Sequence, residues 1–225
     1  MATHPNLPRI LSALLAHYGE APLPEPRKPF ELIVWENTGY LVADDVRARA
    51  FKALKTQVGL SPAKLLSAGP GRIAHVIHDA GMQPQHRAQK VIRCAETAIE
   101  FAGGDLEAAL DALPPPKQRA LLKRFPGIAD PGADKLQLLC GYANVPALES
   151  NGLRVLQRLG LALDDPSYAR AYKSAVAMLR DAKVNYEQAF ALLRAHGRDL
   201  CKRSEPLCAM CPIRKTCPYG LRAVP

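Results

Sequence analysis

Hydrophobic residues recur through most of the chain at spacings of three and four residues, the pattern of helices that bury one face. Near the N-terminus, for example, Ile10, Leu11, Leu14 and Leu15 fall on one side of a helix. Strand-forming residues are sparse, whereas alanine, leucine, arginine and lysine dominate, so we expect an all-α protein. One helix is predicted within residues 1–20, and the others cover residues 30–41, 45–58, 62–68, 72–80, 86–102, 106–113, 117–125, 132–143, 151–160, 166–182 and 185–200.

Local chemistry sets the ends of these helices. Asp44, Ser61 and Asp105 stand where a side-chain oxygen can accept a hydrogen bond from the first turn of the following helix. Pro62 follows Ser61 at a position where the missing N–H is harmless. The glycine–proline–glycine run at 69–71 predicts a break between two helices.

Composition narrows the class of protein. The 225 residues are 48% hydrophobic, which is enough for one large domain or two small ones around a shared core. The formal net charge is +9. A basic protein usually has an anionic partner, and nucleic acid is the commonest, although a merely basic surface would give the same charge.

No apolar run reaches the length of a membrane span. The N-terminal stretch also lacks the basic start and the small-residue cleavage site of a signal peptide. We therefore expect a cytoplasmic protein without a membrane partner. In that reducing compartment, clustered cysteines are more often metal ligands than disulfides.

Four cysteines near the C-terminus stand in the spacing C-x6-C-x2-C-x5-C: Cys201, Cys208, Cys211 and Cys217. Four thiolates in one short loop suit either a tetrahedral zinc ion or a [4Fe–4S] cube. The two remaining cysteines lie on helical patterns and are expected in the core. Lysines and arginines inside the loop either balance an anionic centre or contact phosphate.

The segment LLKRFPGIADPGADKLQLL, at 121–139, places a Pro-Gly turn between two helices. Together with ESNGLRVLQRLG and the cysteine spacing, it resembles the endonuclease III-like family of helix–hairpin–helix DNA glycosylases. The resemblance runs from about Phe30 to Tyr219 and implies a two-lobed all-α fold with a C-terminal [4Fe–4S] cluster loop. It places a six-helix lobe at 29–145 and the catalytic-acid and cluster lobe at 146–225, with 1–28 packed on the latter.

The resemblance also assigns the hairpin. Gly127 would open a turn whose backbone N–H groups, with those of the next helix, hold a DNA phosphate. Two positions depart from the family pattern. Ala129 stands where the family has a second glycine, and Pro131 stands where members that also cut the backbone carry a catalytic lysine. Lys135 lies one helical turn further on.

The family's catalytic aspartate falls on Glu149, just before N-x-x-R-V. Removing a base breaks an N-glycosidic bond through a transition state with positive charge on the sugar, which a nearby carboxylate stabilises. The alternative is that Glu149 merely caps the following helix, a role that Ser150 or Asn151 would fill equally well.

The segment 30–45 takes the place of the family helix that faces the flipped base. Trp35 and Tyr40 are candidates to stack on that base, and Glu36 and Asn37 to bond its edge, Glu36 also as a catalytic acid. Both aromatic residues would serve equally as core residues. Leu41 aligns with an intercalating residue, and the loop 82–86, with Gln85, could enter the base stack from the other side.

Taken together, the resemblance implies a monomeric glycosylase of the bacterial cytoplasm or nucleoid, acting on double-stranded DNA that holds a damaged or mismatched base. Since Pro131 has no amine, we expect a monofunctional enzyme. A bifunctional glycosylase with lyase activity and a non-catalytic DNA-damage binding protein are the alternatives.

Overall fold

The computed structural model describes residues 6–23 and 26–223. Their regular structure is α-helical or 3-10 helical, apart from one isolated bridge between Tyr40 and Gly81. The expected all-α class is therefore confirmed. Among the helices of these two ranges, none is long and apolar enough to cross a membrane.

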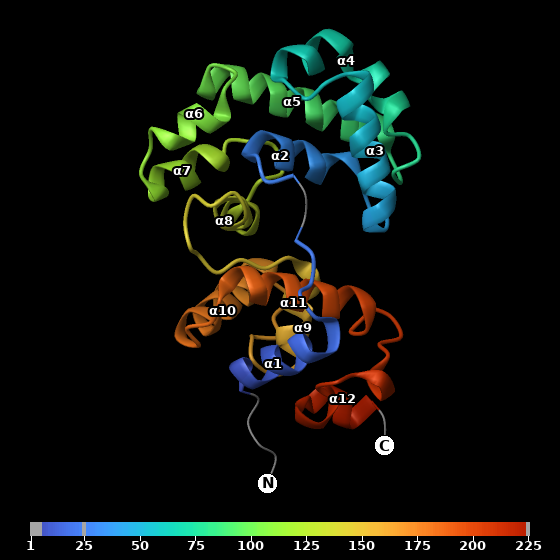
Figure 1. Ribbon diagram of the computed structural model, residues 1–225, viewed down its shortest axis with the longest axis vertical. Coiled ribbons are helices and arrows are strands. Elements are labelled where there is room, and N and C mark those ends of the chain that lie inside the picture. Colours follow the sequence, from blue (N-terminus) through green and yellow to red (C-terminus); the bar gives the residue numbers. More distant parts are fainter. Residues whose placement is uncertain (1–5, 24–25, 224–225) are drawn as a thin grey trace. The chain divides into compact units, whose positions relative to one another are not determined.

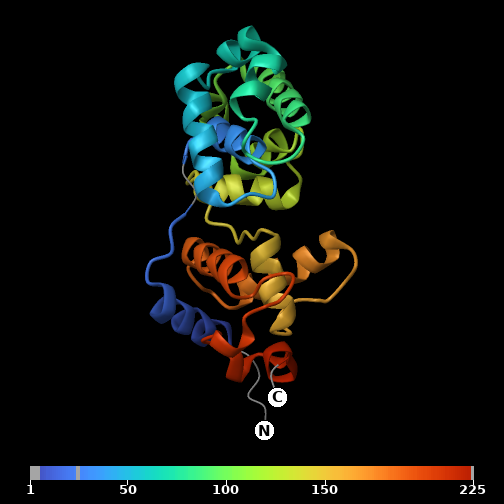
Figure 2. The same ribbon diagram turned by 90° about the vertical axis from the view of Figure 1, so that its right-hand side faces the viewer.

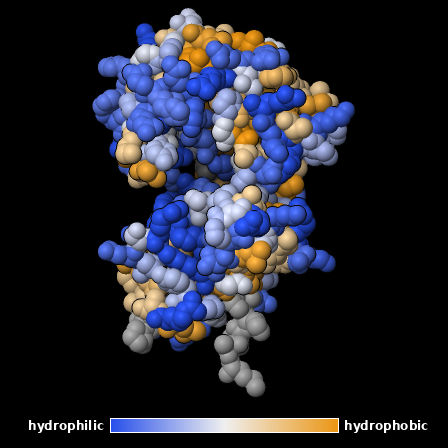
Figure 3. Space-filling model, turned by 180° about the vertical axis from the view of Figure 1, so that it is seen from behind, coloured by the Kyte–Doolittle hydropathy of each residue, from blue (hydrophilic) through white to orange (hydrophobic). Residues whose placement is uncertain are grey.

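The chain forms two compact units, 24–142 and the pair of segments 1–23 and 143–225. We call them the hairpin unit and the cysteine unit. The sequence placed the corresponding boundaries at 29–145 and 146–225, with an N-terminal segment 1–28. Of that segment, residues 1–5 and 24–25 lie outside the described residues. On the face drawn in Figure 3, hydrophilic side chains dominate and hydrophobic ones form small separate patches.

The hairpin unit is built around its longest helix, α5 (Pro84–Ala102), which packs against α2, α4 and α6 (Figures 1 and 2). Its core is mostly aliphatic, with Leu32, Leu54 and Leu110 fully buried. Within the described residues this unit holds seven helices, whereas the resemblance implied six and the residue pattern predicted eight; the helices predicted at 62–68 and 72–80 run on across the kink in α4. These helices are α2 (Pro29–Thr38), α3 (Asp44–Gln57), α4 (Pro62–Val76), α5 (Pro84–Ala102), α6 (Leu106–Asp111), α7 (Pro115–Leu122) and α8 (Asp130–Leu139).

Two predicted helix boundaries in this unit were wrong. α2 ends at Thr38 and not near Leu41, because Gly39 adopts an extended conformation. α3 begins at Asp44 itself, with Ala43 in the capping position and no side-chain cap. Asp44 instead lies in the first turn, where a negative charge favours the helix dipole. The shorter α2 leaves Tyr40 and Leu41 in a loop.

Other local predictions were confirmed. The Ser61 hydroxyl accepts a hydrogen bond from the Lys64 N–H at 3.4 Å, and the Asp105 carboxylate accepts one from the Ala108 N–H at 3.0 Å. The break expected at 69–71 is a kink within α4, where Gly69 has non-helical backbone angles. The prediction of a bend from the glycine–proline–glycine run is therefore confirmed.

The cysteine unit packs α1 and α9 against α11, as Figures 1 and 2 show for the blue, yellow and orange-red helices. Leu14, Leu156 and Leu192 lie at the centre of its core. Short 3-10 helices shape the cysteine loop. The elements are α1 (Leu7–Tyr18), α9 (Ser150–Arg158), α10 (Tyr168–Asp181), α11 (Tyr186–Asp199), η1 (Cys208–Met210), η2 (Arg214–Thr216) and α12 (Pro218–Ala223).

A glycine sets the closest approach of α11 to α9. A Cβ atom on Gly197 would lie only 2.5 Å from the backbone oxygen of Asn151. Backbone atoms cannot yield as a flexible side chain does, so the two helices require glycine at this position. The start of α9, which carries Glu149 and Asn151, is thereby held against α11.

We expect Gly197→Ala to lower the free energy of unfolding by about 1–3 kcal/mol, because the added methyl group forces α9 away from α11. Gly71→Ala is the matched control. A Cβ atom there meets nothing within 4 Å, so the substitution should be neutral or slightly stabilising. Chemical denaturation of both variants measures the difference. Equal stabilities would contradict the close approach.

Candidate active site and cysteine pocket

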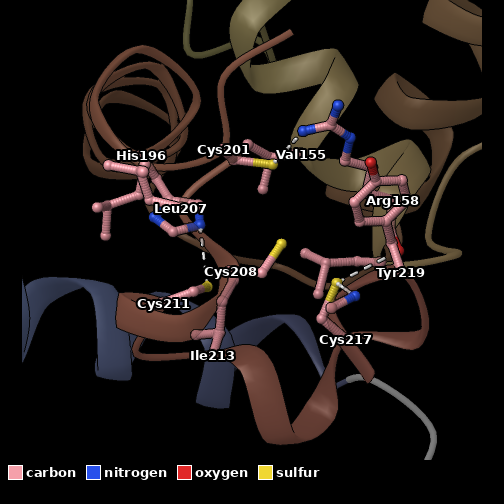
Figure 4. A pocket seen from close by; sticks show the side chains of 13 residues that line it. Val155, Arg158, His196, Cys201, Leu207, Cys208, Cys211, Ile213, Cys217 and Tyr219 are labelled. Atoms are coloured by element: carbon pink, nitrogen blue, oxygen red, sulfur yellow. Dashed lines mark hydrogen bonds between the residues drawn. The ribbon is translucent and has the colours of Figure 1, made fainter. Parts of the chain in front are cut away.

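The four cysteines of the C-terminal loop surround one pocket. Figure 4 shows their sulfur atoms turned toward the same space, between the end of α11 and the loop that carries η1 and η2. Val155 and Leu159 of α9 line the same pocket, as do Leu207 and Ile213 of the loop. Most of the wall is therefore apolar. Among the described residues, no group of three or more histidine, cysteine, aspartate or glutamate side chains is arranged to hold a single metal ion.

Nitrogen donors face three of these sulfur atoms. Arg158 Nη1 donates to Cys201 Sγ at 3.2 Å, and the Gly220 N–H donates to Cys217 Sγ at 3.4 Å. His196 Nε2 lies 3.6 Å from Cys211 Sγ. Donors of this kind stabilise negative charge on sulfur, so the pocket suits thiolates that bind an anionic metal centre.

The imidazole ring of His196 lies between the Tyr18 hydroxyl and the Cys211 sulfur atom. Burial lowers the pKa of His196 to about 4 and raises the pKa of Tyr18, so at neutral pH the imidazole is uncharged and the phenol keeps its proton. The Tyr18 hydroxyl lies 3.1 Å from Nδ1 and can donate to it. When Tyr18 is the donor in this hydrogen bond, the ring proton is on Nε2, which faces Cys211. His196 is 1% exposed, so its role is structural.

Glu149 occupies the capping position of α9, but its side chain makes no capping hydrogen bond. Its Oε1 instead accepts from Asn151 Nδ2 at 3.2 Å and forms an ion pair with Arg194 Nε at 3.2 Å. The side chain is 26% exposed. The carboxylate is thus held in place by two neighbours and still reaches solvent.

Arg154 connects this carboxylate to the cysteine loop. Its Nη2 donates to Asn151 Oδ1 at 2.9 Å, and its Nε donates to the Cys201 carbonyl, also at 2.9 Å. Asn151 therefore accepts from Arg154 on one side and donates to Glu149 on the other. The position of the carboxylate depends on the segment that carries the first cysteine.

A second carboxylate, Glu36 in α2 of the hairpin unit, forms an ion pair with Lys135 of α8. Glu36 Oε2 lies 2.7 Å from Lys135 Nζ, and the lysine side chain is only 9% exposed. A buried ammonium group needs such a partner, since taking an unpaired charge out of water is expensive. The sequence placed Glu36 and Lys135 separately and did not pair them.

The other base-pocket candidates on α2 are engaged within the hairpin unit. Trp35 is buried, with its ring edge-to-face with Phe51 and beneath the guanidinium of Arg47, so its interpretation as a base-stacking residue gives way to the core alternative. Asn37 Nδ2 donates to the Ile33 carbonyl at 2.9 Å along its own helix and remains half-buried.

The helix–hairpin–helix turn lies between α7 and α8. Gly127 has φ of 83°, a left-handed conformation that favours glycine, and a Cβ there would meet nothing within 4 Å. Ala129 has φ of −93°, which any residue adopts, so the turn needs no second glycine. Asp130 lies at the start of α8, where Lys123 at 2.6 Å and Arg119 at 3.1 Å bind its carboxylate. Pro131 follows it in the first turn.

The predicted intercalating residues are exposed, as is Tyr40, the candidate for stacking on the base. Tyr40, Leu41 and Met82 are 50%, 79% and 59% exposed, and Gln85 is exposed in the first turn of α5. The loop that carries Leu41 and the loop that carries Met82 are in contact with each other. They lie side by side in the hairpin unit, joined at the bridge between Tyr40 and Gly81.

Sequence reasoning missed four arginines. Arg154, Arg158 and Arg194 hold Glu149, Asn151 and Cys201, and Arg87 binds the loops of Leu41 and Met82. Only one signal was available. Arg154 and Arg158 stand four residues apart within N-x-x-R-V-L-Q-R, so they share a face of α9, beside buried positions. Arginines on a partly buried face must find acceptors, but the sequence does not say which ones.

The comparisons with known proteins agree on one family. No protein-family model matches the chain. An endonuclease III from Sulfolobus acidocaldarius is 30% identical over 173 residues, which are 76% of this chain and 74% of that protein. A thymine-DNA glycosylase from Aeropyrum pernix is 26% identical over 166 residues, 71% of this chain and 69% of that protein.

A solved structure of endonuclease III, trapped as a covalent intermediate with DNA, has the same fold. The TM-score is 0.80 with 20% sequence identity, over 100% of both chains. The fold and the archaeal relatives thus point the same way as the hairpin and the four cysteines. The chain belongs to the endonuclease III family and is a DNA N-glycosylase of base-excision repair.

Proposed function

We propose that this protein is a monofunctional glycosylase, which removes a damaged or mismatched base from double-stranded DNA and leaves the sugar–phosphate backbone intact. The observation that carries the proposal is that α8 presents no accessible amine to the sugar. Pro131 has no amine at the family position, and Lys135, the lysine within α8, is buried in an ion pair with Glu36.

A lyase reaction needs an uncharged amine that attacks C1′ of the sugar and forms a Schiff base. An ammonium group held 2.7 Å from a carboxylate has no free electron pair for that attack. It is also poorly accessible, because 9% of the side chain is exposed. Lys135 therefore supports base recognition or stability rather than strand cleavage.

Glu149 is the proposed catalytic carboxylate. As the N-glycosidic bond lengthens, positive charge develops on the sugar, and a carboxylate at that point stabilises the transition state. The same carboxylate can orient the attacking water and accept its proton. The ion pair with Arg194 requires an ionised Glu149, and Asn151 fixes the direction of Oε1. Neither contact uses the carboxylate as a helix cap.

Glu36 is proposed to contact the edge of the extruded base. Since Lys135 pairs with it, Glu36 is ionised and acts as a hydrogen-bond acceptor for N–H groups of the base. A role as proton donor would first require that the ion pair be broken. Tyr40, half exposed beside α2, remains the proposed stacking residue.

The cysteine pocket is proposed to hold a [4Fe–4S] cluster, which many members of this family carry. The four thiols fit this group, because they face one pocket and N–H donors are directed at three of the sulfur atoms. The bound cluster would cross-link the loop and carry a one-electron couple. Arg158 then holds Cys201 against α9, and its guanidinium also covers the Tyr219 ring at 4.4 Å.

Replacing Glu149 tests the catalytic assignment. We expect Glu149→Gln to bind a lesion-bearing duplex as the wild type does but to release base at least about a hundredfold more slowly, because the charge is lost at nearly constant size. Single-turnover kinetics measure the rate, and fluorescence anisotropy measures binding. Glu100→Gln, an exposed carboxylate on α5, is the control. A wild-type rate in Glu149→Gln would leave Glu149 a structural residue.

Borohydride trapping tests the absence of lyase activity. Reduction during turnover converts a Schiff base into a covalent protein–DNA adduct. We expect no adduct on the preferred lesion, and strand breaks only after alkali treatment. A strong adduct that disappears in Lys135→Met would show that the buried amine becomes the nucleophile and that the enzyme is bifunctional.

Metal analysis tests the cluster. We expect about four iron atoms per chain after anaerobic purification, with equal sulfide and a brown colour. Cys208→Ser should lose the iron, whereas Cys94→Ser should keep it, because Cys94 lies buried in α5 away from the pocket. Stoichiometric zinc without iron would contradict the assignment and favour a structural zinc site.

A further inference from the structure

The two loops with exposed apolar tips form one element of the hairpin unit. The Tyr40 N–H donates to the Ala80 carbonyl at 3.1 Å. Gly81 has φ of 106°, and a Cβ atom there would lie 2.1 Å from the Tyr40 carbonyl oxygen. Only glycine allows this approach, so the backbone of the loop before α3 is fitted to that of the loop before α5.

Arg87, in the first turns of α5, binds both loops from beneath. Its Nε donates to the Met82 carbonyl at 2.9 Å, and its Nη2 donates to the carbonyls of Gly81 at 2.8 Å and Ile77 at 3.2 Å. Its Nη1 donates to the Thr38 carbonyl at the end of α2. The residue is 5% exposed. One guanidinium thus joins residues 38 and 82.

The acceptors of Arg87 are backbone carbonyls rather than carboxylates. The planar guanidinium presents several N–H groups in fixed directions, which a lysine ammonium cannot reproduce. Charged donors bind carbonyls more strongly than neutral ones, and the burial of the group would be costly if any of these bonds were missing. The arrangement therefore fixes the backbone of the loops rather than any one side chain.

The side chains at the tips of these two loops are apolar and exposed to water, which is unfavourable. Leu41 and Met82 are among the exposed large hydrophobic residues, and Tyr40 stands beside them. Leu41 and Gln83 both have positive φ, 54° and 55°, which side chains larger than glycine rarely adopt. A strained backbone that holds apolar side chains in solvent points to a ligand. Apolar side chains held in this way insert between base steps and unstack them.

We propose that Arg87 is a positioning residue, which locks the loops of Leu41 and Met82 into a single wedge that opens the base stack beside the lesion. The inference rests on the proposed function only in taking duplex DNA as the ligand. Arg87 itself touches neither DNA nor the reacting atoms. Its effect on base release passes through the two loops.

The test measures unstacking without any bond cleavage. A duplex carries an abasic-site analogue, tetrahydrofuran, with 2-aminopurine as the adjacent base, whose fluorescence rises when it is unstacked. Saturating wild-type protein should raise this fluorescence. Arg87→Lys and Arg87→Met should remove at least about half of the rise at saturation, because the loops are no longer fixed. Leu110→Val, in the core of α6, is the control for general loss of stability and should keep the full rise.

A second variant keeps the inference testable if the Arg87 variants fold poorly. Leu41→Ala with Met82→Ala removes the wedge side chains and leaves Arg87 in place, so it should abolish most of the rise. Adding Arg87→Lys to this double variant should change little further, because residues that act through one another are not additive. Additive losses, a full rise in Arg87→Lys, or no rise with the wild type would each overturn the proposal. Failure of base release on lesion-bearing duplexes would instead count against the glycosylase proposal alone.

Discussion

A guanidinium group that is taken partly or wholly out of water is stabilised by acceptors for its N–H groups, and in each unit of the protein one arginine gathers such acceptors from separate segments. Arg87 gathers backbone carbonyls from two loops in the hairpin unit. Arg154 joins the start of α9 to the cysteine loop in the other unit. In each case the charge connects segments that lie far apart in the sequence. Removing the arginine would leave several buried carbonyls without a donor.

In the cysteine unit, this connection ties the proposed catalytic carboxylate to the cysteine loop. Glu149 depends on Asn151, Asn151 on Arg154, and Arg154 on the Cys201 carbonyl. Gly197 lets α11 approach closely enough to complete the arrangement. A centre bound by the four cysteines would therefore order more than its own loop. It would also limit the positions open to Glu149, where a shift of about an ångström costs much of the rate.

Much of the fold was predictable because helix periodicity, capping and proline are local signals. Ser61, Asp105 and the kink at Gly69 were placed correctly for this reason. The end of α2 was not, since hydrophobic periodicity continues to Leu41 while the backbone leaves the helix at Gly39. Nor could the sequence pair Glu36 with Lys135, because a long-range ion pair has no local pattern.

In the candidate site too, residues that belong to local motifs could be predicted, whereas residues placed by long-range contacts could not. The cysteines were recognisable from their spacing, and Glu149 from its place before N-x-x-R-V. The arginines that hold them were not, because several of their acceptors are backbone carbonyls, which any residue supplies. For Trp35 the sequence left base stacking and core packing open. An aromatic residue near the expected base pocket suggested stacking, whereas its ring packs on Phe51 in the core.

In the proposed reaction, the protein breaks the N-glycosidic bond and no bond of the sugar–phosphate backbone. Mass spectrometry of the products from a panel of duplexes, each with one damaged or mismatched base, tests it most directly. For at least one duplex, the account predicts free base together with a full-length strand that carries an abasic site. Intact substrate across a broad panel, or a strand already broken on the 3′ side of the abasic site, would contradict it.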